Sequence, residues 1–180
     1  MLPLNFGFHI CGQNEISRFK DEYLTHIISF THPQNKTEPD LSSFNTCPII
    51  HKINMHDVFD NRYHPLELIW PNESIIGNII ELGKSIKQEV DDYNIINVLF
   101  QCSAGISRST ATAYIILNII LGEFNERKCW NLVKSKRHIA RPNPLMVSLA
   151  DKLLNRNFKM MAPMPDCVDW HRVQVDKQSQ

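Results

Sequence analysis

An excess of charge of either sign is absent from this 180-residue sequence, which has 19 Lys and Arg residues against 19 Asp and Glu residues. Proteins that bind nucleic acid or anionic membranes through a general electrostatic surface carry a basic excess, so both classes of protein are disfavoured. Hydrophobic residues make up 43% of the chain and charged residues 21%, which is typical of a globular chain with a buried core. The length predicts a single domain.

Paired cysteines are also lacking. The five cysteines are an odd number, and no two of them have Cys-x-x-Cys spacing. We therefore expect no disulfide framework, and a reducing compartment. The nearest candidate pair of metal ligands is Cys167 with His171, which is too few for a zinc site, so we expect no metal and no cofactor.

Long apolar segments are missing as well. The first twelve residues have no basic segment followed by an apolar core, unlike a secretory signal. The longest apolar run, 113–121, is interrupted by Asn118 and is far shorter than the roughly 20 residues that a membrane-spanning helix needs. The sequence therefore predicts a cytoplasmic protein without a membrane segment.

Strand-like and helix-like patterns alternate along the chain. We expect strands at 5–10, 26–30, 49–55 and 95–100, and helices at 13–21, 74–90, 108–121, 125–136 and 145–154. The run 95–100 is mostly apolar, which suits a strand of a parallel sheet that is buried on both faces. The prediction is a single-domain α/β fold with a central, mostly parallel sheet flanked by helices. Residues 1–157 would form this domain, and 158–180 a C-terminal tail that need not be ordered throughout.

The strongest chemical signal is Cys-Ser-Ala-Gly-Ile-Ser-Arg-Ser-Thr at 102–110, between the predicted strand 95–100 and helix 108–121. Such a loop can aim several backbone N–H groups at one point, and the helix adds the positive end of its dipole. This arrangement binds phosphate. Gly105 would allow the backbone to turn where a Cβ would clash, and Arg108 would hold two phosphate oxygens with its planar fork. We call residues 102–108 the Cys-Arg loop.

The same loop carries a candidate nucleophile. The positive field at its mouth should favour the thiolate form of Cys102, and a thiolate facing a bound phosphate is an activated nucleophile. Ser109 can donate a hydrogen bond to the sulfur and help it to leave when a phosphocysteine is hydrolysed. An ATP-type phosphate loop is excluded, because no lysine precedes Ser109.

The motif Cys-x5-Arg-Ser, in the form Ala-Gly-Ile-Ser-Arg-Ser-Thr after the first serine, resembles the cysteine-dependent protein tyrosine phosphatases, most closely their dual-specificity branch. Residues 111–121 and the segment Arg141-Pro142-Asn143-Pro144 resemble later parts of that branch. The latter is also similar to a compact bacterial tyrosine-phosphatase-like group. The likeness covers 48–155, and more loosely 5–30.

The resemblance implies a phosphatase for phosphorylated protein that acts through a phosphocysteine, without metal or cofactor. It implies a catalytic role for Cys102, Arg108 and Ser109, and substrate binding by Ser103, Ala104, Gly105, Ile106, Ser107 and Arg108. One departure is Gln101, which stands where the family has a histidine that orders the loop and tunes the thiolate.

The family also has an aspartate upstream of the cysteine that protonates the leaving oxygen. Asp57 fits this description because it closely follows the predicted strand 49–55. Asp60 is the second candidate, with Glu67 and Glu73 after it. A turn-capping role for Asp57 is the alternative.

Other functions stay open at this stage. Gln101 is compatible with a phosphate-binding module that has lost turnover, and a rhodanese-type sulfur transferase also uses a cysteine loop. Phosphatases for RNA 5′-triphosphate or inositol phosphate share the fold, but neither the neutral net charge nor the lack of lysine between Cys102 and Arg108 favours them. Among the remaining residues, we expect His56 and His64 at the surface, Cys11 and Cys129 as buried thiols, and 134–137 as a solvated helix end.

Overall fold

The protein, in a computed structural model that describes residues 2–33, 39–41, 44–59 and 68–164, contains a sheet of four parallel strands. The strands are β1 (Phe6–Gly12), β2 (His26–Thr31), β3 (Ile49–Asn54) and β4 (Ile96–Cys102). Their order across the sheet is β1-β4-β2-β3, so β4 lies in the middle and pairs with β1 and β2. The predicted fold class and its mostly parallel sheet are confirmed.

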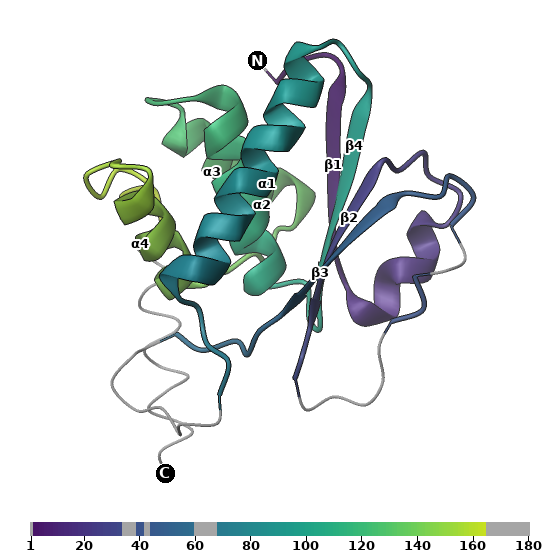
Figure 1. Cartoon of the computed structure of the whole chain (residues 1–180), viewed down its shortest axis with the longest axis horizontal. Coiled ribbons are helices and arrows are strands. Elements are labelled where there is room, and N and C mark those ends of the chain that lie inside the picture. The colour runs from purple at the N-terminus through teal and green to yellow at the C-terminus, as the bar shows by residue number, and fades with distance from the viewer. Residues whose placement is uncertain (1, 34–38, 42–43, 60–67, 165–180) are drawn as a thin grey trace.

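Helices cover both faces of this sheet (Figure 1). The helices α1 (Glu73–Asp91), α2 (Arg108–Leu121), α3 (Glu126–Lys136) and α4 (Pro144–Leu153) lie on one side. A 3-10 helix, η1 (Gln13–Phe19), lies on the other, where we predicted an ordinary helix over 13–21. The larger hydrophobic core fills the side of the four α-helices. The smaller one, on the side of η1, consists of Cys11, Ile16, Leu24, Ile27, Leu41, Phe44 and Leu99.

Helix α2 is the centre of the larger core, and nearly all of its residues are buried. It is apolar around most of its circumference because the sheet and other helices surround it. Helix α1 is amphipathic and packs against α2, with Gly83 close to Ile119 and Ile116. A Cβ at Gly83 would come within 2.7 Å of the Ile119 side chain, so this glycine allows the two helices to approach closely.

The parallel sheet brings its chemically important residues to one edge. Cys102 is the last residue of β4, and its register partner Gly12 is the last residue of β1. Strand β3 ends at Asn54, so Asp57 follows it by three residues. In parallel α/β sheets, ligands bind outside the carboxyl ends of the strands, which is the edge where these residues lie.

The chain after α4 folds back onto the helices. Met160 and Met164 are buried, Tyr114 Oη donates to Met160 O at 2.9 Å, and the Asp151 carboxylate accepts from Phe158 N and Met160 N. The boundary that we predicted at 157 lies inside this packed segment, and 165–180 lie outside the described residues. The division into domain and tail therefore stays a prediction.

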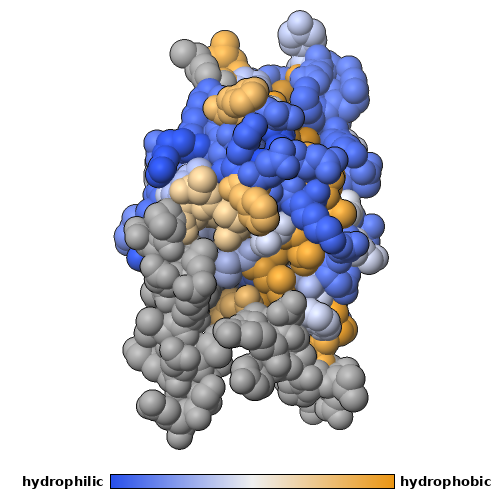
Figure 2. All heavy atoms as spheres, turned by 90° about the vertical axis from the view of Figure 1, so that its left-hand side faces the viewer, coloured by the Kyte–Doolittle hydropathy of each residue, from blue (hydrophilic) through white to orange (hydrophobic). Residues whose placement is uncertain are grey.

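The outer surface of the helical side is largely hydrophilic, with apolar side chains gathered in smaller areas (Figure 2). This pattern follows from amphipathic helices that turn their apolar faces toward the core. None of the described helices is long and apolar enough to cross a lipid bilayer.

Candidate active site

The carbonyl groups of the Cys-Arg loop point away from its centre. Five consecutive carbonyls, those of residues 103–107, each accept a hydrogen bond from a donor outside the loop. The donors are Gln13 N to Ser103 O (3.0 Å), Arg137 Nη2 to Ala104 O (3.0 Å), Arg137 Nε to Gly105 O (3.1 Å), Arg141 N to Ile106 O (2.9 Å) and Ala111 N to Ser107 O (2.9 Å). In a trans peptide the N–H points opposite to the carbonyl, so the N–H groups of residues 104–108 face the inside of the loop. Such a row of donors binds anions.

Gly105 makes this loop possible. Its φ is +68°, in the left-handed region that favours glycine, and a Cβ there would lie 2.5 Å from the backbone of Cys11 and Gly12. Those neighbours are backbone atoms at the end of β1, which cannot move without disturbing the sheet. The loop therefore packs on the end of β1 in a way that only glycine allows.

Cys102 lies at the base of the loop, where its side chain is 1% exposed. Its Sγ is 3.1 Å from Ser109 Oγ, and Ser109 is completely buried in the first turn of α2. The serine hydroxyl can therefore donate to the sulfur. This is the contact that the sequence predicted for Ser109.

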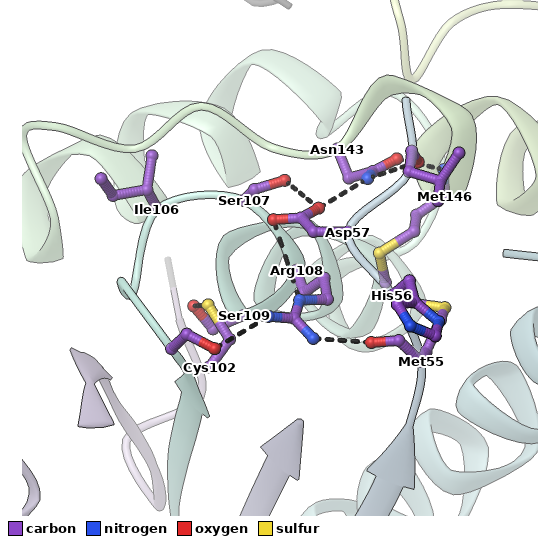
Figure 3. A network of polar contacts seen from close by, with 12 residues as sticks. Met55, His56, Asp57, Cys102, Ile106, Ser107, Arg108, Ser109, Asn143 and Met146 are labelled. Carbon is purple, nitrogen blue, oxygen red and sulfur yellow. Dashed lines mark hydrogen bonds and ion pairs between the residues drawn. The ribbon is translucent and has the colours of Figure 1, made fainter. Parts of the chain in front are cut away.

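Arg108 extends its guanidinium across the site (Figure 3). Nη1 donates to Met55 O at 2.6 Å and Nη2 to Ser103 Oγ at 3.0 Å. Nε is buried, has no hydrogen-bond partner among the described residues, and lies 3.7 Å from Asp57 Oδ2. A buried donor without a partner costs free energy, and an anion bound in the loop would satisfy it.

Asp57 is held beside Arg108 by two side chains. Its Oδ1 accepts from Ser107 Oγ at 2.7 Å and from Asn143 Nδ2 at 2.8 Å, while the aspartate side chain stays 28% exposed (Figure 3). A carboxyl group that is close to the loop and still reachable from solvent can exchange protons with both a bound ester and water.

The outer side of the Cys-Arg loop is clamped by an ion pair that the sequence did not predict. Arg137, just after α3, holds two loop carbonyls with Nε and Nη2, and its Nη1 lies 2.9 Å from both carboxylate oxygens of Glu15. The hydrogen bond from Arg137 lowers the pKa of Glu15, as does the Gly12 N–H. Our prediction that 134–137 form a merely solvated helix end is wrong for Arg137.

The histidine prediction also needs correction. His56 is 5% exposed rather than at the surface, because Nδ1 accepts from Ile69 N at 3.0 Å and its ring packs edge-on against His32 at 4.7 Å. Burial, then His56 and Arg108, lower the pKa of His32. The neutral form of the His32 imidazole is therefore favoured at this side of the site. His64 is outside the described residues.

Gln101 takes part in the sheet rather than in the loop. It is completely buried, and its Oε1 accepts from Ser29 Oγ of the neighbouring strand β2 at 2.6 Å. The residue that departs from the family pattern thus fixes β4 to β2 directly below the nucleophile candidate.

Of the alternative acid candidates, the structure describes only Glu73, which lies away from the site. Glu73 begins α1 and forms an exposed ion pair with Lys152 at 2.6 Å. Asp60 and Glu67 lie outside the described residues, so the choice between them and Asp57 stays a prediction that the contacts of Asp57 support.

Two cysteines lie in the interior as expected. Burial, then the neighbouring Glu15, raise the pKa of the Cys11 thiol to about 12, and burial does the same for Cys129. Both remain thiols near neutral pH. In the described part of the chain, no three His, Cys, Asp or Glu side chains are arranged to hold a metal ion.

Asn143 is the site residue that sequence reasoning passed over, although the quoted segment 141–144 contained it. The local signal was present, because an Asn before Pro144 is a typical helix start. Its contact with Asp57, 86 residues earlier in the chain, has no local signal.

Comparisons with known proteins agree on the fold. No protein-family model and no curated protein matches the sequence. Among solved structures, human tyrosine phosphatase-like serine/threonine/tyrosine-interacting protein is similar with a TM-score of 0.55 and 18% identity, over 84% of this chain and 93% of that chain. DUSP15 is similar with a TM-score of 0.55 and 18% identity, over 95% and 92%. The Yvh1 phosphatase domain from Chaetomium thermophilum has a TM-score of 0.52 and 16% identity, over 87% and 94%.

At these identities the comparisons establish the fold. The chain has the fold of dual-specificity and tyrosine-phosphatase-like proteins, as the resemblance of its motif predicted.

Proposed function

We propose that this protein is a cysteine-dependent phosphomonoester hydrolase whose substrates are phosphotyrosine-containing proteins. The observation that carries the proposal is the row of inward N–H groups at 104–108, which converges with Cys102, Arg108 and Asp57 on one edge of the sheet. An anion-binding loop with a nucleophile at its base and a carboxyl group at its mouth has the parts that phosphate transfer to sulfur requires.

In the first step, the Cys102 thiolate attacks phosphorus. The S–P bond forms as the ester P–O bond breaks, and Asp57 transfers its proton to the leaving oxygen. The loop amides and the Arg108 fork hold the nonbridging oxygens, where negative charge is greatest in the transition state. The products are the dephosphorylated alcohol and a phosphocysteine.

In the second step, water attacks the phosphocysteine. Asp57, now a carboxylate, takes a proton from the water, the S–P bond breaks, and inorganic phosphate is released. Ser109 Oγ, 3.1 Å from the sulfur, donates to the departing thiolate. All of the required groups belong to the chain, so the mechanism needs no metal ion.

The loop composition supports a protein substrate. The Cys-Arg loop contributes one positive side chain, Arg108, and no lysine. A substrate with several phosphates, such as an inositol polyphosphate or an RNA 5′-triphosphate, would gain little additional attraction from this loop. A single aryl phosphate on a peptide matches its charge. The assay described next also decides whether the protein hydrolyses phosphoserine and phosphothreonine.

The test is a phosphatase assay, with EDTA present, on four classes of substrate. These are phosphotyrosine peptides, phosphoserine peptides, inositol phosphates and RNA 5′-triphosphates. We expect hydrolysis of phosphotyrosine, and loss of turnover in Cys102→Ser with substrate binding retained, because a serine hydroxyl is not ionised near neutral pH. Full activity of Cys102→Ser would contradict the covalent step. Activity that EDTA removes and one divalent ion restores would contradict the metal-free mechanism.

A second candidate function is phosphate binding without turnover, which Gln101 favours because a histidine is usual at its position. Release of product in a stoichiometric burst from a chromogenic aryl phosphate would exclude it. Binding of phosphopeptide with neither burst nor steady turnover would establish it in place of the hydrolase.

A further inference from the structure

We propose that the groove between β3 and α1 binds a segment of the substrate polypeptide next to the phosphotyrosine, through an aliphatic side chain of that segment. This inference rests on the proposed function and extends it, because it says which part of a phosphorylated protein is recognised beyond the phosphate itself. We call this feature the β3–α1 groove.

The β3–α1 groove has an apolar floor and a polar rim. Its volume of about 370 Å³ lies at the lower end of the roughly 300–1,000 Å³ that is usual for ligand sites. The described residues that line it are His51, Lys52, Ile53, Asn54, Ile75, Asn78, Ile79 and Leu82. Ile53, Ile75 and Leu82 are half-buried, because their inner sides pack against the larger core while their outer sides line the groove. Asn54 and Asn78 are exposed, so amide groups stand at the rim where the main chain of a peptide would lie.

The two walls of the groove have matching lengths. Helix α1 begins near the carboxyl ends of the strands and runs back toward their amino ends (Figure 1). From Ile75 to Leu82 the helix advances about 10 Å, at roughly 1.5 Å per residue. From His51 to Asn54 the strand also advances about 10 Å, at roughly 3.3 Å per residue. A groove of this length accepts about three residues of an extended chain.

Strand β3 offers further apolar surface beside the groove. It is the outermost strand on its side of the described sheet, and Ile49 and Ile50 are 58% and 39% exposed. Proteins usually protect an edge strand with charged residues or proline rather than with exposed isoleucines. Contact with a bound segment would remove this surface from water, which stabilises the complex.

The groove begins close to the candidate active site. Asn54 lines the groove as the last residue of β3, the next carbonyl, Met55 O, accepts from Arg108, and Asp57 follows two residues later. The Cα atoms of Asn54 and Asp57 are therefore at most about 11 Å apart. A substrate whose phosphate lies in the Cys-Arg loop would reach the groove with a residue roughly three to six positions from the phosphotyrosine. This continuity assigns the groove to the substrate.

The lining favours an uncharged, apolar side chain. Lys52 is the one Lys, Arg, Asp or Glu among the described lining residues, and it is exposed, so an ion pair with it would contribute little. A charged side chain on the floor would lose its hydration without a partner, whereas leucine or isoleucine would bury apolar surface. We therefore expect a preference for an aliphatic residue at a fixed distance from the phosphotyrosine.

Two variants change the groove from different sides. Asn78→Trp fills it, because Asn78 is exposed on α1 and can be enlarged without entering the core. Leu82→Gln makes its wall polar with a residue that also favours helix. The matched control is Gln88→Trp, an exposed position of the same helix outside the lining, whose side chain donates only to Asp92 Oδ1 at 2.9 Å. Thermal unfolding of all three shows whether the fold is kept.

The experiment measures kcat and KM for a small aryl phosphate and for phosphotyrosine peptides made of serine and glycine, in which a single leucine occupies successive positions on either side of the phosphotyrosine. In the native enzyme, leucine at a position roughly three to six residues away should raise kcat/KM by about 10-fold over the leucine-free peptide. The gain should lie mainly in KM, because a contact remote from the phosphate forms equally in the ground state and the transition state.

The variants locate this gain. Asn78→Trp and Leu82→Gln should abolish it and leave kcat/KM for the aryl phosphate unchanged, since that substrate does not reach the groove. Gln88→Trp should match the native enzyme on every substrate.

The outcomes separate this inference from the proposed function. Turnover of phosphotyrosine peptides without any effect of leucine, or a gain that survives both groove variants, would overturn the role of the groove and leave the hydrolase standing. A native dimer that Leu82→Gln converts to a monomer in sedimentation would assign the groove to a second copy of the chain instead. A native protein without turnover of any phosphotyrosine substrate would remove the proposed function, and this inference with it.

Discussion

The two ends of the parallel sheet both bury polar side chains, but they arrange them differently. At the amino ends, Asn97 Nδ2 donates to Tyr23 O at 2.8 Å, Asn5 Nδ2 to Val90 O at 2.8 Å, and His26 Nε2 is 3.5 Å from Glu89 Oε1. Each of these contacts joins two separate segments of the chain, and the three contacts do not face a common point. At the carboxyl ends, Arg108 and Asp57 lie next to each other beside the Cys-Arg loop, whose inward N–H groups face the same place. Convergence of donors, rather than burial of polar groups, distinguishes the candidate active site.

Shifted pKa values alone would not identify the candidate active site. Burial lowers the pKa of His26 and of His51, whose rings stack at 5.5 Å, so the amino end holds the more obviously perturbed pair of groups. Structural networks perturb pKa values as active sites do. The two ends therefore make opposite predictions: changes at the carboxyl end should affect turnover, and changes at the amino end should affect stability.

The largest effect is expected from Gly105→Ala, which breaks the carboxyl end. The added Cβ would lie 2.5 Å from the backbone of β1 and would occupy a positive-φ position, so the loop must move and turnover should be lost almost completely. The measurement is kcat/KM on an aryl phosphate. The matched control is Gly122→Ala, which has a similar φ of +76° but open space around it. Comparable loss of turnover in both variants would show that strain, and not the collision, is responsible.

Asp57→Asn should have the next largest effect. General acid catalysis is worth roughly 10²–10⁴-fold, and we expect that loss for poor leaving groups, with a much smaller one for good leaving groups. The slope of log kcat/KM against the acidity of the leaving phenol measures it. Glu73→Gln is the control carboxylate and should leave the slope unchanged, since Glu73 pairs with Lys152 at the surface. A changed slope in Glu73→Gln with an unchanged one in Asp57→Asn would reassign the acid.

Arg137→Ala should weaken the loop from its outer side. It removes two hydrogen bonds to loop carbonyls and the ion pair with Glu15, while leaving all inward groups in place. Charged hydrogen bonds stabilise by roughly 1.5–3 kcal/mol each, so we expect a loss of about 10- to 100-fold in kcat/KM and weaker binding of phosphate. Lys134→Ala, on the preceding helix turn, is the control. Unchanged phosphate binding in Arg137→Ala would show that the loop holds its shape without the clamp.

The smallest effect on catalysis is expected at the amino end, where acid should destabilise the fold. A histidine whose folded pKa is lowered stabilises the protein above its unfolded pKa of about 6.5, and this stabilisation is lost as pH falls toward the folded pKa. The urea midpoint should therefore fall between about pH 7 and pH 5. His26→Gln should make this fall shallower and leave kcat/KM at neutral pH unchanged. A loss of turnover in His26→Gln at neutral pH would contradict the separation of the two ends.

The fold was predictable from sequence because its signals are local. A pattern of a few neighbouring residues is enough to indicate each main feature. This holds for the buried strand 96–102, the amphipathic helix 73–91 and the glycine in the Cys-Arg loop. The strand was expected to end at 100, and it continues to Cys102 because it pairs with β1 through Gly12. That extension depends on a partner strand and has no counterpart in the local pattern.

Side-chain contacts across the chain could not be predicted in the same way. Arg137 reaches Glu15 over 122 residues, and Asn143 reaches Asp57 over 86. A basic residue near the end of a helix usually serves the helix dipole, and an asparagine before proline usually caps a helix, so local reasoning gives each of them a sufficient role. Only the tertiary arrangement shows that Arg137 also contacts the Cys-Arg loop and that Asn143 also contacts Asp57.

The strand order has a consequence for how the chain is made. Strand β1 lies at the edge of the described sheet and pairs only with β4. Because Phe6 pairs with Ile96, β1 cannot join the sheet until β4 has been synthesised. At a synthesis rate of about 5–20 residues per second, roughly 5–20 s separate the two strands on the ribosome. During that interval the apolar face of β1 has no partner strand, and β2 with β3 forms the earliest complete pair. The nascent protein is therefore most exposed to chaperones and to misassociation before its central strand emerges.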